Sequence, residues 1–226
     1  MHLKGFSCLT LSYILYTVQH MKMLELSQTF DATKLPVQQH ALVLHSPEHS
    51  KATATKYVNE SLSREQLTVY LPVDTENNNN NNNSSQNSEK VPEIINYEDN
   101  VSRGSLLTLD IRPFYNSAVK GDVKKPFEEL KTLLEEAINE RVVSGKNDGV
   151  TIVSGIAGTL VANQKFEESI SAEKWWQETH SEWLQKGLKI TMICPHPRPT
   201  FDKSQLVHYK QAISSLHHVV VDPNLS

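Results

Sequence analysis

The chain alternates short apolar runs with amphipathic stretches. The clearest strand is Ala41 to His45 (ALVLH), an uninterrupted apolar run that ends at Ser46 and Pro47. The clearest helix opens at Pro126, and its leucines and other apolar residues recur every three or four positions up to Gly145. The pattern predicts further strands at 66–73, 105–111, 150–153, 189–194 and 217–221, and further helices at 48–61, 172–186 and 203–216. Ser46 is expected to cap the first helix, and Pro195 is expected to break the fifth strand. A loop, Arg112–Tyr115, is expected after the third strand.

This order of elements fixes the expected fold class. Strands of four to seven apolar residues, separated by helices, favour a parallel sheet, because parallel strands need crossover connections and are buried on both faces. We therefore expect an α/β fold in three layers, with a mostly parallel sheet and helices on both faces.

Two segments are expected to lie outside this fold. Phe6 to Val18 is an apolar run that resembles a signal peptide or anchor, but it is shorter than the roughly 20 residues that span a bilayer. Residues 1–22 are thus interpreted as an N-terminal extension or a mis-assigned start, the alternative being a true N-terminal helix. Residues 23–226 are expected to form one domain, with a disordered loop at 75–90 around seven consecutive Asn.

Composition narrows the function classes. The net charge of −4 gives no electrostatic reason to expect nucleic acid as a partner. Two distant cysteines, Cys8 and Cys194, favour a reducing, cytoplasmic setting over a disulfide framework. The ten histidines are scattered without metal-binding spacing, so the sequence predicts neither a metal nor a cofactor.

Nucleotide-binding motifs are incomplete. The segment after the first strand, HSPEHSKATATKY, contains Lys51 but no glycine, and Pro47 removes a backbone donor where a phosphate loop needs one. Gly155 and Gly158 form only a GxxG pattern. Asp110 ends a strand where a metal ligand could lie, but the favoured interpretation is a cap or a salt bridge to Arg112.

Ligands of parallel α/β folds bind beyond the carboxyl ends of the strands. The candidate ligand-binding residues expected near that edge are His45, Asp110, Tyr115, His196 and His217. Each also has a purely structural interpretation, such as a strand end, a core aromatic or a turn residue. Cys194 is expected to be a buried apolar group rather than a nucleophile.

Residues 40–222 resemble a MEDS domain, the sensory module of methanogen and methylotroph regulators. The resemblance rests on Ala41–His45, on Leu109–Asp110 with Phe114–Tyr115, on Trp175–Leu184, on Ile193–Pro197 and on Phe201 through His217–Val221. It implies a RecA/KaiC-like fold that lacks the Walker A motif and senses a signal. The output modules that often accompany the family cannot be found in this chain.

The leading hypothesis is a non-catalytic sensory domain that binds a small ligand or a signalling partner. The alternative is a degenerate nucleotide-binding protein that holds ATP through Lys51 without hydrolysis. A third hypothesis makes Trp175 and Trp183 an exposed interaction face, although core packing is the preferred interpretation. A hydrolase or transferase would need a reactive constellation that these residues do not provide. We expect a monomer or dimer with no membrane partner.

Overall fold

The computed structural model describes residues 36–46, 49–72, 94–143, 149–203 and 206–222. The N-terminal apolar run and the Asn-rich segment lie outside these ranges, so the expectations for 1–22 and 75–90 remain predictions.

The described residues build a six-stranded sheet in which every pair of neighbouring strands is parallel. The strands are β1 (His40–His45), β2 (Leu67–Leu71), β3 (Leu106–Thr108), β4 (Gly149–Ser154), β5 (Lys189–Pro197) and β6 (Val219–Val221). Their order in the sheet is β3-β2-β4-β5-β1-β6. The parallel α/β prediction is confirmed, and all six predicted strands are present.

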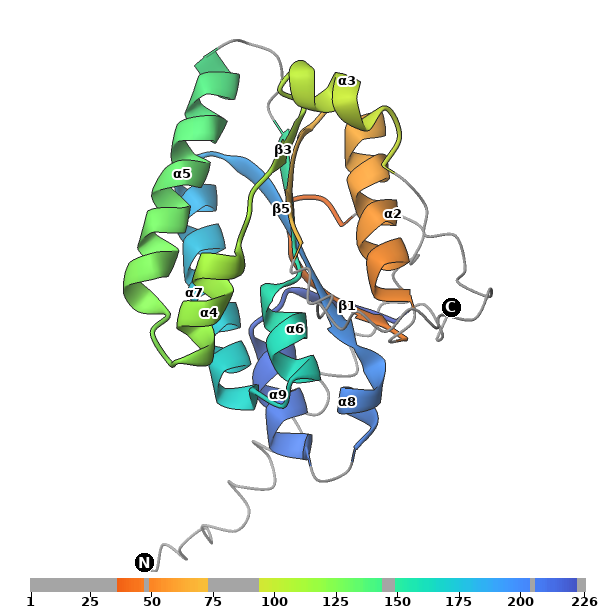
Figure 1. Ribbon diagram of the computed structural model, residues 1–226, viewed down its shortest axis with the longest axis vertical. Helices are drawn as coiled ribbons and strands as arrows, with labels where there is room; N and C mark the ends of the chain where they lie inside the picture. Colours follow the sequence, from red (N-terminus) through yellow and green to blue (C-terminus); the bar gives the residue numbers. More distant parts are fainter. Residues whose placement is uncertain (1–35, 47–48, 73–93, 144–148, 204–205, 223–226) are drawn as a thin grey trace, which may run out of the picture.

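Helices cover both faces of the sheet (Figure 1). One face carries α2 (Ser50–Ser63) and α3 (Tyr97–Ser102), and the other carries α4 (Arg112–Val119), α5 (Lys124–Val143), α6 (Ile156–Ala162), α7 (Phe166–Gln185) and α9 (Val207–Ser215). The short helix α8 (Arg198–Asp202) follows the end of β5. The chain moves in one direction across the sheet from β1 to β3 and in the opposite direction from β3 to β6. Because crossover connections are right-handed, the two sets of helices lie on opposite faces.

β1 shows why the apolar runs are nearly continuous. Every residue of β1 is buried. Ala41 and Val43 pack in the same hydrophobic cluster as Tyr57 of α2. Leu42 and Leu44 point to the opposite face and pack with the residues of α8 and α9. Both faces of the strand are therefore core, as expected in a sheet covered on both sides.

The predicted end of the fifth strand at Pro195 is wrong. β5 continues to Pro197 and pairs with β1 along its length, whereas its pairing with β4 ends at Ile193. The amide of Met192 donates to Gln39 on the β1 side, so the alternate positions Pro195 and Pro197 direct their nitrogens away from β1. Because β4 no longer pairs there, the missing proline donors break no ladder.

Other predicted boundaries also change. The loop expected at Arg112–Tyr115 is the start of α4, with a proline in its first turn. The helix after β1 begins at Ser50 with His49 at its N-cap, while the hydroxyl of Ser46 bonds instead to the ring of His49, at 2.7 Å. The predicted helix at 203–216 is α9, which begins at Val207, and a separate helix that was not predicted, α8, precedes it.

Candidate functional site

The five predicted ligand-binding residues do not form one site. His45 ends β1 and donates from Nδ1 to the carbonyl of Ser46, at 2.8 Å. Tyr115 lies on α4, where its hydroxyl accepts a hydrogen bond from Asn163, at 2.9 Å. Only His196 and His217 approach each other, with ring centroids 6.3 Å apart, and both are buried.

Asp110 has the structural role favoured from the sequence. Its carboxylate accepts two close hydrogen bonds from the Arg112 guanidinium, at 2.8 and 2.6 Å, and a third from the Arg112 amide. The Arg112 hydrogen bonds lower the pKa of Asp110 to about 2. The pair is exposed to solvent and faces no other candidate residue.

An ion pair lies at the carboxyl end of the sheet, at its switch point. β1 lies between β5 and β6, and the connections from β1 and β5 leave on opposite faces, which is where parallel α/β folds bind ligands. Arg198 follows β5 and pairs with Asp222, which follows β6. The two charges therefore meet across the carboxyl end of β1 and neutralise each other there.

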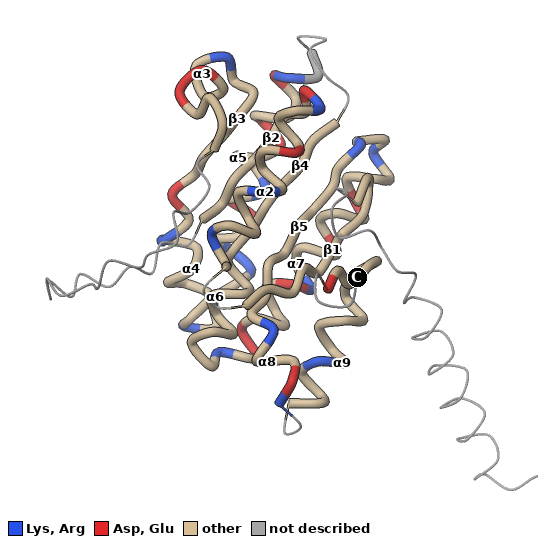
Figure 2. The backbone as a smooth tube through the Cα atoms, turned by 90° about the vertical axis from the view of Figure 1, so that its right-hand side faces the viewer, with Lys and Arg blue, Asp and Glu red and all other residues tan. Residues whose placement is uncertain are grey.

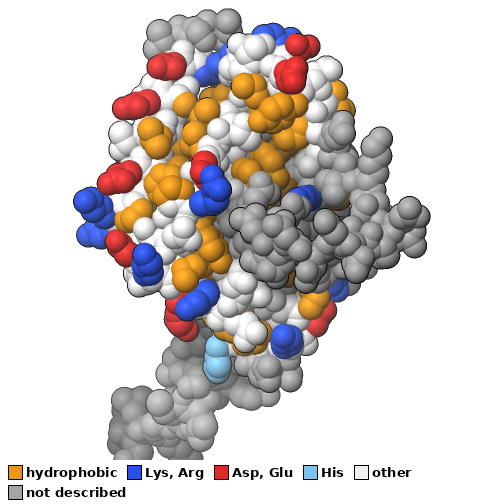
Figure 3. Space-filling model, in the orientation of Figure 1, with side chains coloured by type: hydrophobic (Ala, Val, Ile, Leu, Met, Phe, Trp, Pro, Cys, Tyr) orange, Lys and Arg blue, Asp and Glu red, His pale blue; other side chains and the backbone are white. Residues whose placement is uncertain are grey.

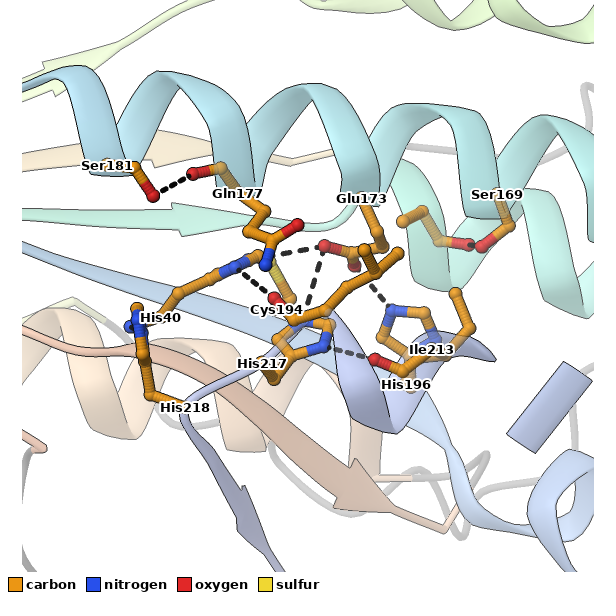
Figure 4. Close-up of polar contacts among 12 residues, drawn as sticks. His40, Ser169, Glu173, Gln177, Ser181, Cys194, His196, Ile213, His217 and His218 are labelled. Atoms are coloured by element: carbon orange, nitrogen blue, oxygen red, sulfur yellow. Dashed lines mark hydrogen bonds and ion pairs between the residues drawn. The ribbon is translucent and has the colours of Figure 1, made fainter. Parts of the chain in front are cut away.

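A buried polar cluster lies between the sheet and α7. We call it the His–Glu–Cys cluster and define it as His40, Glu173, Cys194, His196 and His217 (Figure 4). His40 begins β1, Glu173 lies on α7, Cys194 and His196 lie two residues apart on β5, and His217 lies between α9 and β6. All five side chains are buried, and Glu173 has no exposed surface. A carboxylate in such a place must be compensated by hydrogen bonds or by positive charge.

Three ring nitrogens surround the Glu173 carboxylate. His196 Nε2 donates to Oε1 at 2.7 Å. Oε2 lies 3.3 Å from His40 Nε2 and 3.2 Å from His217 Nε2. Neither of these two contacts has hydrogen-bond geometry, so Oε2 and His217 Nε2 are buried without a hydrogen-bond partner. Buried polar atoms without a partner are uncommon in protein cores, and a bound ion is one of their ordinary explanations.

Backbone carbonyls fix the tautomers of two of these rings. His40 Nδ1 lies 3.1 Å from the carbonyl of Leu216, and His217 Nδ1 lies 2.8 Å from that of Ile213. A carbonyl oxygen only accepts, so each ring must donate its Nδ1 proton. A neutral ring then has its lone pair on Nε2, facing Glu173. His40 Nε2 also lies 3.3 Å from Cys194 Sγ, and it accepts a hydrogen bond from the thiol.

Burial sets the charges of the cluster. It is the largest effect on the pKa of His40, which it lowers to about 4, and it also lowers that of His196. Burial and the negative charge of Glu173 raise the pKa of Cys194 well above its usual value. Burial also opposes ionisation of Glu173, but the charge of His217 and the hydrogen bond from His196 hold its pKa well below the usual range. These shifts favour a carboxylate at Glu173, a thiol at Cys194 and neutral rings at His40 and His196, and positive charge must compensate the buried carboxylate.

A second layer of contacts orients the cluster. The Tyr209 hydroxyl lies 3.4 Å from His196 Nδ1 and 3.2 Å from the Ser169 hydroxyl, which donates to the carbonyl of Ala157. On the far side, the His40 amide donates to His218 Nδ1 at 3.0 Å. These bonds tie β1, α6, α7 and α9 to the same centre.

Sequence reasoning missed Glu173 and His40. Glu173 was overlooked because glutamate in an amphipathic helix is ordinarily assigned to the exposed face. The signal was its spacing: Glu173, Trp176, His180 and Trp183 follow one another at steps of three, four and three residues, so they share one stripe of α7. All four are buried.

The tryptophan interaction face proposed as a third hypothesis is wrong. Trp175 is 8% exposed and Trp183 is fully buried, and both belong to the main hydrophobic core. The preferred interpretation, core packing, is confirmed.

A separate hollow of about 380 Å³ lies between α3, β3 and α5. Its walls include Leu67, Val101, Leu106, Leu107 and Ala137, and hydrophobic side chains gather on this upper part of the surface (Figure 3). Arg141 at its rim donates to the carbonyl of Arg103 and the hydroxyl of Ser105. The hollow brings together few polar groups that could orient a ligand.

Acidic and basic residues are interspersed along the described helices (Figure 2). None of the described helices is long and apolar enough to cross a membrane.

The structure is an all-parallel α/β domain whose core contains the buried His–Glu–Cys cluster, in which the charge of each side chain depends on its neighbours. No protein-family model matches the chain, and no curated protein matches it. Among solved structures, it is similar to the flagellar accessory protein FlaH from Methanocaldococcus jannaschii, at 12% sequence identity. The similarity covers 79% of this chain and 69% of that chain, with a TM-score of 0.36. So distant a likeness carries no functional argument, and the MEDS resemblance stays a prediction.

Proposed function

We propose that the chain is a non-catalytic regulatory domain whose sensing element is the His–Glu–Cys cluster. The observation that carries the proposal is the pair of buried atoms without hydrogen-bond partners, Glu173 Oε2 and His217 Nε2, 3.2 Å apart. A ligand or ion bound by both atoms would stabilise the folded state. Its loss would leave the buried Glu173 carboxylate without sufficient compensating charge or hydrogen bonds.

The position of the cluster supports a regulatory role. Its members come from β1, α7, β5 and the α9–β6 connection. A change of occupancy would therefore alter how the segment from α9 to β6 packs against the rest of the sheet. That segment is the part of the domain that could transmit the signal to a protein partner.

Catalysis is disfavoured by the same burial. Cys194 is a thiol with a raised pKa, hydrogen-bonded to His40, and thiols rather than thiolates are poor nucleophiles. All five residues of the cluster are closed off from solvent, so a substrate has no visible route to them.

The alternative function, nucleotide binding without hydrolysis, has one observation in its favour. Lys51 is exposed in the first turn of α2, the helix that follows β1, where a phosphate-binding lysine would lie in a parallel α/β fold. The absence of glycine before it and the presence of Pro47 weigh against this function.

A thermal-shift titration of the full chain, refolded with each ligand present because the cluster is closed off in the folded state, separates the two functions. The ligands are ATP and ADP with Mg²⁺, a panel of small metabolites and a panel of divalent transition metals. A ligand that binds only the folded state stabilises it by about 2.7 kcal/mol at about 100 times its Kd. We expect saturable stabilisation by a non-nucleotide ligand, lost in Glu173→Gln and retained in Glu178→Gln, an exposed position on the same helix.

Two outcomes would contradict the proposed function. A Mg-nucleotide shift abolished by Lys51→Ala would establish the alternative. Stabilisation by none of the ligands would leave the cluster as a structural feature of the core.

A further inference from the structure

The contacts of Glu173 define the kind of occupant. Oε2 lies 3.3 Å from His40 Nε2 and 3.2 Å from His217 Nε2, yet neither nitrogen is aligned to donate to it. When the rings are neutral, all three atoms present lone pairs to one another. These lone pairs point to a common position beside the three atoms and not directly at one another. A cation that is bound by all three atoms requires this arrangement.

We infer that His40, Glu173, Cys194 and His217 form a binding site for a zinc-class divalent transition metal. The spacing of these residues along the sequence does not predict this site, because they come from four separate parts of the fold. The inference deepens the proposed function, on which it rests, by naming the chemical class of the occupant.

The distances fit four-coordinate geometry. The potential ligand atoms of the four residues all lie within 4.8 Å of one another. Zinc bonds to nitrogen and oxygen are about 2.0–2.1 Å, so neighbouring ligands of a tetrahedral site are about 3.4 Å apart. The two contacts of Oε2, at 3.3 and 3.2 Å, and the 3.3 Å contact of His40 Nε2 with Cys194 Sγ are close to that value.

The charge balance also fits. When the metal enters, Cys194 gives up its thiol proton and becomes a thiolate, and His217 gives up the Nε2 proton whose charge compensates Glu173 in the metal-free state; both protons go to solvent. Two neutral imidazoles, one carboxylate and one thiolate then carry two negative charges, which a divalent ion neutralises. A neutral assembly suits side chains that are 0–8% exposed, because an uncompensated charge is costly there.

Supporting hydrogen bonds surround the four ligands in the manner of known metal sites. Metal-binding histidines ordinarily donate the proton of their other ring nitrogen to a carbonyl or carboxylate. His40 donates to Leu216 O, and His217 donates to Ile213 O. His196 holds Glu173 Oε1 at 2.7 Å, which leaves Oε2 for the metal. His196 is therefore a positioning residue and not a ligand.

The ligand types select the metal. Thiolate and imidazole favour zinc and its neighbours among the transition metals over Mg²⁺ or Ca²⁺, which prefer oxygen ligands. Four protein ligands close the coordination sphere and leave no position for a substrate, as in structural and regulatory sites. This agrees with a domain that senses rather than catalyses.

The test is metal analysis and cobalt spectroscopy of the full chain. Because the site is sealed, the metal is supplied during expression, in separate media supplemented with Zn²⁺ or Co²⁺. We expect one metal ion per chain and, for the cobalt form, thiolate-to-metal charge-transfer absorption with the intense visible bands of a tetrahedral site. Cys194→Ala should lose the charge-transfer absorption, and His217→Gln should lower the metal affinity by about 100-fold or more.

Two further variants control the interpretation. His208→Gln removes an exposed histidine on α9 and should leave the metal content and the spectrum unchanged, which excludes adventitious surface binding. His196→Gln should weaken metal binding by about 10–100-fold while the charge-transfer absorption is kept, because only the orientation of Glu173 is lost.

The wild-type cobalt spectrum keeps the inference falsifiable even if a variant fails to fold. A metal-free wild-type chain, a cobalt form without thiolate absorption, or absorption that survives in Cys194→Ala would each overturn it. Stabilisation by a metabolite, lost in Glu173→Gln, in a chain that binds no metal would overturn the metal site and leave the proposed function standing.

Discussion

His217 places its Nε2 atom 3.2 Å from the Oε2 atom of Glu173, inside the core and outside hydrogen-bond geometry. The histidine lies just before the last strand, and the glutamate lies in the middle of α7. Because the two side chains lie so close together, the packing of β6 against the rest of the sheet depends on the charge state of the Glu173 carboxylate.

The first prediction concerns that carboxylate. Glu173→Gln keeps the volume of the side chain but removes the charge that the surrounding histidines compensate. Measured by urea unfolding with a chelator present, the free energy of unfolding should fall by about 3 kcal/mol. The matched control Glu178→Gln, on the exposed face of α7, should change it by less than about 0.5 kcal/mol. Equal effects of the two variants would show that burial of Glu173 carries no special cost.

The second prediction concerns the approach of α6 to β5. A Cβ atom at Gly158 would lie 2.0 Å from the carbonyl oxygen of Pro195, which is backbone and cannot turn away. Gly158→Ala should therefore destabilise the protein by about 3 kcal/mol, although Gly to Ala inside a helix ordinarily stabilises by up to about 1 kcal/mol. Gly149→Ala is the comparison, because its Cβ meets only the flexible end of Gln66 and should cost less. A stabilised Gly158→Ala variant would contradict the described packing.

The third prediction compares two buried tryptophans. Trp183 Nε1 donates to Glu135 Oε1 at 2.8 Å, whereas Trp176 Nε1 is buried without a partner. The same change to Phe loses a hydrogen bond at Trp183 and removes an unsatisfied donor at Trp176. Trp183→Phe should be more destabilising than Trp176→Phe by about 2 kcal/mol in chemical denaturation. The opposite order would mean that cavity formation outweighs the polar contribution.

The fourth prediction concerns alkaline pH. Burial, followed by the charge of Glu60, raises the pKa of Tyr57 to about 12, and Lys56 Nζ lies 5.7 Å from the ring centroid. An unfolded tyrosine ionises near pH 10, so the stabilisation is complete below pH 10 and is lost as the pH rises toward 12. Stability measured by denaturation from pH 8 to pH 11.5 should fall less steeply in Tyr57→Phe than in the wild type. Tyr97→Phe, at an exposed position, should follow the wild-type profile.

The sheet was predictable because its strands are buried on both faces. Runs such as Ala41–Leu44 and Val150–Val153 are apolar at every or nearly every position, which is typical of central parallel strands. β3 is only three residues long, and it pairs with β2 alone, so the longer predicted strand was wrong. α4 was predicted as a loop, although Pro113 in its first turn is a common start of a helix.

The site was less predictable because its residues come from distant parts of the chain. His196 and His217 were proposed as ligand-binding residues of the carboxyl edge; His196 is the penultimate residue of β5, but His217 precedes β6 at its amino end, and both are buried. Cys194 is buried, as expected, but the 3.3 Å contact of its thiol with His40 was not predicted. Spacing along the sequence cannot reveal such contacts, since they depend on which strands become neighbours.

The strand order has a consequence for biosynthesis. β1 is the first described strand to leave the ribosome, but its two neighbours in the sheet are β5 and β6, the last two described strands. Throughout translation of the intervening residues, the nascent chain therefore carries Ala41–Leu44 as an unpaired hydrophobic strand, the kind of segment that chaperones shield. A ribosome that stalls before His217 would release a chain with an open sheet and an incompletely compensated carboxylate, which makes β6 a checkpoint for the integrity of the described sheet.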